Sequence, residues 1–131
     1  MVVAVKNFIS SRAASFRHAF HGWHHVFRTQ RNVWIHSAIA TAVFILGVWL
    51  RLPARDWAVI ILTAAVVFAA EFMNTAIEAV VDLASPDTHP LAKIAKDVGA
   101  GAVLVAALAA ILIGLLLIGP PLWAKIVLLF T

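Results

Sequence analysis

The chain has 131 residues, of which 63% are hydrophobic and only 12% are charged, whereas about a quarter of the residues in a typical soluble protein are charged. A water-soluble core of this size could not bury so much apolar surface, so we predict one membrane-embedded domain over residues 1–131. The net charge of +4 favours anionic lipid headgroups or an anionic substrate over nucleic acid, because the basic residues lie beside hydrophobic segments. The absence of cysteine excludes disulfides and thiolate metal sites.

Residues 1–31 are predicted to form an amphipathic helix on the membrane surface. Aromatic residues recur in this segment at helical spacings, and arginines and histidines lie between them. The pattern is typical of a helix whose aromatic side chains enter the headgroup region while its cations meet phosphates. Gly22 is a candidate break between two pieces of this helix. His21 and His25 have the spacing of a metal site, but a polar helix face is the preferred interpretation because no acidic or thiol partner lies nearby.

Three hydrophobic segments follow, at residues 32–50, 57–81 and 98–118. Each is predicted to be a transmembrane helix, because about 20 apolar residues span a bilayer. The third segment is rich in glycine and alanine, which allow close contact between helices. A polar helical turn at residues 91–97 precedes it. The predicted fold class is therefore all-α and integral to the membrane, with three spans and one surface helix.

Turn signals separate the predicted spans. Pro53 is expected to end the first span, and Asp56 is a candidate cap for the second. Pro86 and Pro90 are expected to interrupt helical structure between the second and third spans. The run Gly119-Pro-Pro-Leu-Trp123 is predicted to end the third span and to leave a short apolar tail at the interface.

The distribution of basic residues predicts the orientation of the spans. Three spans place the N-terminal segment and the loop after the second span on the same side of the membrane. That side carries more lysine and arginine than the other side, so we expect it to be cytoplasmic, in the cell inner (plasma) membrane. The basic residues of the cytoplasmic side are Lys6, Arg12, Arg17, Arg28, Arg31, Lys93 and Lys96, and those of the opposite side are Arg51, Arg55 and Lys125.

A polar stripe interrupts the second span. Glu71, Asn74, Glu78 and Asp82 fall within an arc of about 80° on a helix, and the other faces are apolar. Ionisable residues inside a membrane are costly and are usually functional. A purely structural seam would need basic partners on the facing spans, which offer only His36 near one end. A functional site is therefore the preferred interpretation.

The stripe and the polar turn at residues 91–97 lie at the same cytoplasmic end. Carboxylate and amide oxygens suit Mg²⁺, and lysines suit phosphates. Glu71 lies deepest in the apolar part, where a general base would meet a hydroxyl group that only a lipid can supply. The residues favour metal-assisted phosphoryl transfer to a lipid, with a small ion or proton channel or a non-catalytic assembly protein as alternatives. The sequence contains neither a GxxxxGK[ST] loop nor a kinase-type glycine loop, which excludes a known soluble nucleotide-binding fold.

The sequence resembles the small prokaryotic diacylglycerol kinase / undecaprenol kinase family at Phe16–Gly22, Thr29–Asn32, Glu71–Asp82, His89–Asp97 and Ala100–Leu104. The resemblance implies a homotrimer of three-span subunits whose sites lie between subunits, near the cytoplasmic face. It implies transfer of the γ-phosphoryl group of MgATP to the hydroxyl group of undecaprenol or diacylglycerol, without a nucleic acid partner. The form of the His89–Asp97 stretch looks more like the members that phosphorylate undecaprenol.

The resemblance also implies roles for individual residues. Glu71 is implied to be the catalytic base, with Asn74 beside it in the catalytic site. Glu78 and Gln30 are implied to bind the metal. Many members carry a glutamate where this chain has Gln30, and weaker Mg²⁺ binding is expected from the uncharged amide. The residues implied to bind the nucleotide are His18, Glu78, Asp87, His89, Lys96 and Asp97.

Overall fold

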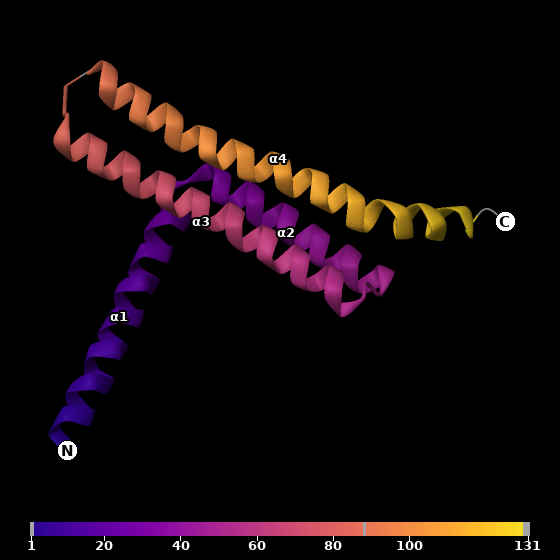
Figure 1. Ribbon diagram of the computed structural model, residues 1–131, viewed down its shortest axis with the longest axis horizontal. Coiled ribbons are helices and arrows are strands. Elements are labelled where there is room, and N and C mark those ends of the chain that lie inside the picture. The colour runs from indigo at the N-terminus through magenta and orange to yellow at the C-terminus, as the bar shows by residue number, and fades with distance from the viewer. Residues whose placement is uncertain (1, 88, 130–131) are drawn as a thin grey trace. The chain divides into compact units, whose positions relative to one another are not determined.

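The computed structural model describes residues 2–87 and 89–129, and all regular secondary structure in these residues is α-helical. The chain divides into two compact units, residues 1–31 and residues 32–131. The first unit contains α1, and the second contains the other helices. The prediction of an all-α chain with three candidate membrane spans is confirmed. The helices are α1 (Val2–Thr29), α2 (Arg31–Leu50), α3 (Ala54–Ala84) and α4 (Pro90–Val127), as Figure 1 shows.

The three helices of the second unit are long and apolar enough to cross a membrane. They have 20, 31 and 38 residues, and only 11 to 22% of the residues in their apolar windows are buried. At about 1.5 Å per residue, α3 is ~46 Å long and α4 is ~57 Å long. The hydrocarbon core of a bilayer is only about 30 Å thick. Both helices are therefore longer than the spans predicted at residues 57–81 and 98–118, and they have room to extend into water.

The antiparallel pair α3 and α4 forms the main helix–helix interface of the second unit (Figure 1). Val67 of α3 and Val103 of α4 are buried, and Gly99 of α4 lies against the side chain of Asn74. A glycine at this point lets the two backbones approach closely, as small residues do between membrane helices. The close approach holds the polar stripe of α3 against α4.

The turn between α2 and α3 is tight. Arg51 adopts φ 56°, a left-handed conformation that often closes a helix, and the Leu52 N–H donates to the Gly47 carbonyl at 3.0 Å. The prediction that Asp56 caps α3 is wrong. Pro53 holds the N-cap position, and its carbonyl accepts the N–H of Asp56 at 3.0 Å. Asp56 instead lies in the first turn of α3, where a carboxylate interacts favourably with the helix dipole.

The predicted end of the third span at residues 119–123 is also wrong, because α4 contains both Pro120 and Pro121 and continues to Val127. Proline removes one helical hydrogen bond, but membrane helices tolerate it, because leaving the helix altogether would expose more backbone groups to hydrocarbon. A contact with α2 also holds the last turns of α4: Lys125 Nζ donates to the Trp49 carbonyl at 2.9 Å and lies 4.3 Å from the centre of the Trp49 ring.

The helix α1 is continuous through Gly22, so the predicted break at this residue is wrong. One glycine costs a helix only about 1 kcal/mol relative to alanine, which the hydrogen-bonded turns on either side can absorb. Phe16 and Phe20 are exposed, and the rings of Trp23 and Phe27 are stacked with centroids 5.9 Å apart. The side chains of residues 2–11 and 13 lie outside the described part of the structure, so the aromatic and basic pattern predicted at the start of this helix rests on the sequence alone.

Gly47 offers a test of the α2–α3 packing. A Cβ atom at this position would lie 2.9 Å from two carbons of the Trp57 ring and 3.2 Å from Leu52 Cδ1. We expect Gly47→Ala to lower the free energy of unfolding by about 1–3 kcal/mol, the usual cost of overpacking. Thermal unfolding in one detergent measures this change. The control is Gly101→Ala, whose Cβ would meet no atom within 4 Å. Equal melting temperatures for both variants would contradict the packing described.

Candidate functional site

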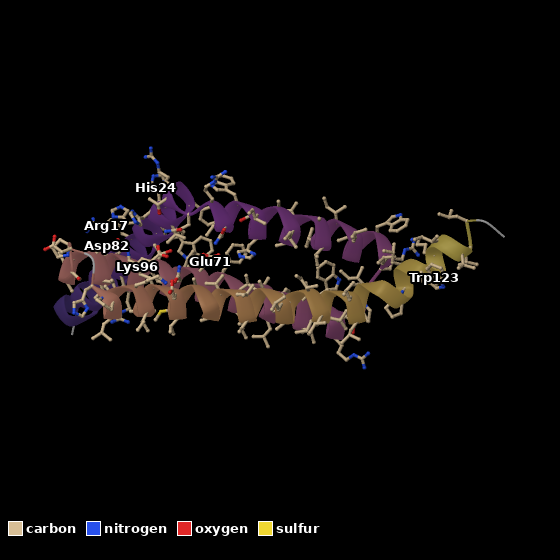
Figure 2. All side chains as sticks on the ribbon, turned by 90° about the horizontal axis from the view of Figure 1, so that it is seen from above. Arg17, His24, Glu71, Asp82, Lys96 and Trp123 are labelled. Carbon is tan, nitrogen blue, oxygen red and sulfur yellow. The ribbon has the colours of Figure 1, made fainter. Side chains whose placement is uncertain are left out.

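The polar stripe of α3 changes gradually from buried to exposed. Glu71 is 1% exposed and Asn74 is 8% exposed, whereas the side chain of Asp82 is 65% exposed. A span of about 20 residues that begins at Trp57 ends near Ala76. We therefore expect Glu71 to lie just inside the hydrocarbon region and Asp82 to lie outside it. Figure 2 shows the same order, with Asp82 beside Lys96 near the α3–α4 loop and Glu71 farther along the helices.

The carboxylate of Glu71 has a side-chain partner on a different helix. Glu71 Oε1 lies 3.1 Å from Nε2 of His36, which is on α2. When Glu71 is ionised, this contact requires the imidazole proton on Nε2, because a carboxylate can only accept hydrogen bonds. The Thr75 hydroxyl donates to the Glu71 backbone carbonyl at 2.9 Å, so this buried hydroxyl has a hydrogen-bond partner of its own. A buried carboxylate without a partner would be costly, so the contact with His36 stabilises Glu71 in this position.

The next polar pair lies one turn farther along α3. Asn74 Nδ2 donates to Glu78 Oε1 at 2.9 Å, whereas Asn74 Oδ1 is buried without a hydrogen-bond partner. This oxygen lies against Gly99, where an added Cβ would be only 2.4 Å away. Buried amide oxygens nearly always have partners in native proteins, so an unpaired one is a candidate contact for a ligand. The sequence grouped Gly99 with the glycines of helix packing and missed its contact with the site.

Two ion pairs lie at the loop end of the second unit. Lys96 Nζ donates to Asp82 Oδ1 and joins α4 to α3, and Lys93 Nζ donates to Asp97 Oδ2 within α4. These side chains are between 39% and 78% exposed. Exposed ion pairs contribute about 0–1 kcal/mol each. The two lysines can therefore exchange a carboxylate for a phosphate at small cost.

The start of α4 is fixed by its capping residues. His89 is the N-cap and its Nδ1 accepts the Leu91 N–H at 3.2 Å, while Pro90 occupies the first turn, where its missing N–H is not needed. Pro90 thus begins the helix, and the polar turn at residues 91–97 is its first part. On the other side of the loop, the Ser85 hydroxyl donates to the Asp87 carbonyl at 3.0 Å.

The loop and the two ion pairs surround a cavity of about 670 Å³. The structure thus brings together four of the residues predicted to bind a nucleotide, together with Asp82 and Lys93. The residues that line this cavity, called the loop cavity below, are Val81, Asp82, Ser85, Pro86, Asp87, His89, Pro90, Ala92, Lys93, Lys96 and Asp97.

Two predicted site residues belong to the first unit. His18 is exposed on α1, and its ring centroid lies 6.5 Å from that of His21. Gln30 lies between α1 and α2, and its backbone N–H donates to the Val26 carbonyl at 2.9 Å. Their roles in metal and nucleotide binding remain predictions from the sequence.

The donor set around Asn74 fits Mg²⁺ only in part. Among the described residues, no group of three or more histidine, cysteine, aspartate or glutamate side chains could hold a metal ion. Glu78 offers a carboxylate, and the unpaired Asn74 Oδ1 offers a neutral oxygen. Mg²⁺ is commonly bound by one or two carboxylates together with substrate phosphates. The residues therefore fit a metal ion that arrives with a phosphate ligand.

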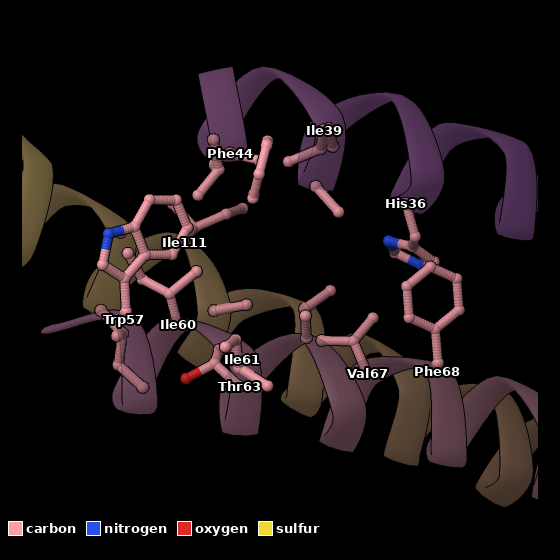
Figure 3. Close-up of a pocket in the computed structure, with 17 residues that line it drawn as sticks. His36, Ile39, Phe44, Trp57, Ile60, Ile61, Thr63, Val67, Phe68 and Ile111 are labelled. Atoms are coloured by element: carbon pink, nitrogen blue, oxygen red, sulfur yellow. The ribbon is translucent and has the colours of Figure 1, made fainter. Parts of the chain in front are cut away.

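A second, apolar cavity of about 410 Å³ lies between α2, α3 and α4. Figure 3 shows His36 and Phe68 at one end of it and Phe44 and Trp57 at the other. Its lining is almost entirely hydrophobic, so His36 is the group that connects it to the polar stripe through Glu71. The cavity and the buried carboxylate are thus neighbouring features.

Comparisons with known proteins agree on one family. The model of the family described as prokaryotic diacylglycerol kinase matches residues 17–118. A diacylglycerol kinase of Synechocystis sp. is 47% identical over 114 residues, which cover 86% of this chain and 65% of that protein. An undecaprenol kinase of Bacillus subtilis is 46% identical over 108 residues, which cover 82% of this chain and 88% of that protein. A diacylglycerol kinase of Escherichia coli is 34% identical over 90 residues, which cover 63% of this chain and 73% of that protein. The chain thus spans slightly less than two thirds of the Synechocystis protein.

Gly99→Ala tests the contact between α4 and Asn74. The new Cβ would displace the Asn74 amide and break its hydrogen bond to Glu78, so we expect turnover in the activity proposed below to fall by about tenfold to a hundredfold. Gly101→Ala has open space around the new Cβ and is expected to keep wild-type turnover. Equal turnover in the two variants, measured with the same lipid and detergent, would show that the Asn74 position does not matter.

Proposed function

Because the chain belongs to the prokaryotic diacylglycerol kinase family, as its sequence predicts, we propose that it transfers the γ-phosphoryl group of ATP to the hydroxyl group of a membrane lipid. The observation that carries the proposal is the buried carboxylate of Glu71, which lies on the same helix as the polar residues that lead to the loop cavity. A lipid hydroxyl approaches from the membrane and ATP approaches from water. The ion channel and non-catalytic assembly alternatives gain no support, because these relatives are named as kinases.

Glu71 serves as the general base in this proposal. Its carboxylate takes the proton of the lipid hydroxyl as that oxygen attacks the γ-phosphorus of ATP. The bond between the γ-phosphorus and the oxygen that bridges to the β-phosphate breaks, and ADP leaves with that oxygen. Little covalent chemistry remains for the protein, so positioning and charge stabilisation dominate phosphoryl transfer. A carboxylate on a rigid helix, just inside the hydrocarbon region, meets the positioning requirement.

The loop cavity holds the nucleotide. Lys96 and Lys93 exchange their carboxylate partners for phosphate oxygens, which accept charge-assisted hydrogen bonds in the same way, and the exposed ion pairs are weak enough to break. Asp97 and Asp87 are left to accept hydrogen bonds from the nucleotide or to orient the lysines. His89 contributes its free Nε2–H, since its Nδ1 accepts the hydrogen bond that caps α4. His18 is a further proposed nucleotide-binding residue, as the family resemblance implies.

Asn74 and Glu78 are the proposed Mg²⁺ ligands of the second unit, together with phosphate oxygens of ATP, and Gln30 is a further proposed ligand. The metal would neutralise charge that develops on the transferred phosphoryl group. The protein's own part is to keep the Asn74 and Glu78 side chains locked to one another by the hydrogen bond at 2.9 Å. That hydrogen bond orients the remaining carboxylate oxygen of Glu78 and the unpaired Asn74 Oδ1 as ligands.

We also propose that the chain works as a homotrimer in the plasma membrane, with the loop cavity on the cytoplasmic side and α1 on the membrane surface. The large apolar area left exposed on α2, α3 and α4 supports burial in lipid and against other copies. The small residues of α4, including the open position Gly114, allow close contact with another copy. Arginine and lysine favour the loop end, as cytoplasmic segments do.

The activity is tested with purified protein, labelled ATP, Mg²⁺ and either undecaprenol or diacylglycerol. We expect label in at least one lipid, and we expect Glu71→Gln to reduce turnover by about a hundredfold or more, because an amide cannot act as a base. Asp56→Asn, a matched carboxylate-to-amide change at the other end of α3, is expected to leave turnover unchanged. Label in neither lipid, or full turnover of Glu71→Gln, would refute the proposal.

The lipid acceptor is chosen by the same assay. The relatives with 47% and 46% identity are named for different lipids, so overall similarity does not select between them. The form of the His89–Asp97 stretch favours undecaprenol. Greater kcat/KM for undecaprenol than for diacylglycerol would support this choice, and the reverse ratio would assign diacylglycerol.

Gln30→Glu tests the metal site. A glutamate at this position would replace a neutral oxygen ligand with a charged one, so we expect the Mg²⁺ concentration for half-maximal turnover to fall about threefold to tenfold. The maximal rate should change much less than the Mg²⁺ requirement. Gln30→Ala should raise the requirement. If both variants show the wild-type Mg²⁺ dependence, Gln30 does not bind the metal.

A further inference from the structure

The hydrogen bond between His36 and Glu71 points to a role that the family comparison and the sequence signature do not assign. His36 is the sole ionisable residue between Arg31 and Arg51. Its side chain is 17% exposed, and its Nε2 lies 3.1 Å from Oε1 of Glu71, which is 1% exposed. Polar side chains in membrane helices are costly and rarely lack a task. Here the partner is the carboxylate that acts as the base.

We propose that His36 is a positioning residue that holds the Glu71 carboxylate in the orientation required for proton transfer. The inference rests on the proposed lipid kinase activity and deepens it. The Nε2–H of a neutral His36 donates to Oε1, which fixes the rotation of the carboxylate group. Oε2 then remains available to accept the proton of the lipid hydroxyl. Catalytic bases are commonly oriented by a third group in this way.

The surroundings of the pair explain why an orienting group is needed. Water at this depth cannot hold an ionised carboxylate, because Glu71 is almost completely buried. The Thr75 hydroxyl does not do so either, since it donates to the backbone carbonyl of Glu71. Asn74 donates to Glu78 instead. His36 is therefore the group from a neighbouring helix that contacts the carboxylate, among the residues that the structure describes.

His36 contacts the proposed base and also lines the apolar cavity. It lines one end of that cavity, so the carboxylate that it holds lies next to a space lined almost entirely by apolar side chains (Figure 3). The imidazole remains neutral while the proton passes from the hydroxyl to Glu71. No charge on His36 has to be created in the hydrocarbon region, where it would be costly.

Kinetics of three variants test the role. His36→Phe keeps a ring of similar size but removes the donor, and we expect kcat to fall about tenfold to a hundredfold while the KM for ATP stays within about twofold. His36→Gln supplies an amide N–H near the position of Nε2 and is expected to restore kcat to within about threefold of wild type. Ser37→Ala is the control, because its hydroxyl donates to the Val33 carbonyl of the same helix.

A double-mutant cycle separates positioning from a general packing defect. In a Glu71→Asp background the shorter carboxylate no longer reaches the imidazole, so His36→Phe should lower kcat by less than about threefold there. A packing defect would cost the same factor in both backgrounds. That outcome, or wild-type kcat in His36→Phe, or failure of His36→Gln to restore activity, would overturn the proposal.

A spectroscopic measurement tests the contact without turnover. In protein with labelled histidine, the imidazole ¹⁵N signals of His36, assigned by their loss in His36→Gln, should indicate the tautomer with the proton on Nε2. These signals should shift in Glu71→Gln and stay in place in Glu78→Gln, which alters the next turn of α3. Unchanged signals in Glu71→Gln would overturn the contact. Absence of lipid phosphorylation by the wild-type protein would instead refute the proposed function.

Discussion

The arrangement of the second unit depends on one costly feature, a carboxylate buried in an apolar helix bundle. Glu71 is 1% exposed and lies about five residues inside the expected end of the hydrocarbon region. A charge at this depth is tolerated only with a well-placed partner, which His36 supplies from α2. The contact links α2 to α3 at the level where a lipid hydroxyl would lie. The position of α2 is therefore fixed by the hydrogen bond between His36 and Glu71 as well as by hydrophobic packing.

The hairpin of α3 and α4 connects this buried carboxylate to polar residues that are exposed near the loop. Gly99 brings the two helices close at Asn74, and the Lys96–Asp82 ion pair joins them again near the loop. Both helices are longer than a bilayer is thick, so the polar residues follow one continuous path from hydrocarbon to water. Exposure rises along that path, from Glu71 through Asn74 to Asp82.

The sequence predicts features that depend on helical periodicity and misses those that depend on contacts between helices. The stripe at Glu71, Asn74 and Asp82 follows directly from the spacing of polar residues on one helix face. The sequence showed His36 only as a basic residue near one end of a facing span and Gly99 only as a small residue, because it does not indicate which residue 35 or 25 positions away each one contacts. The wrong end assigned to α4 at Pro120 has a different cause: rules for proline derive mainly from helices in water, where an unpaired carbonyl can bind solvent.

The differing strengths of the polar contacts suit their different tasks. The pair of His36 and Glu71 is buried, so it is held firmly and keeps one geometry. The pairs of Lys96 with Asp82 and of Lys93 with Asp97 are largely exposed, so each contributes little and breaks readily. A base that must act repeatedly in one orientation requires the first kind of contact. Under the proposed function, lysines that bind and release a phosphate in each cycle require the second kind, because a firm resting ion pair would compete with ATP and weaken its binding. The gradient of burial along α3 thus matches the proposed function, with rigid contacts where the lipid hydroxyl would react and exchangeable contacts where the nucleotide would bind.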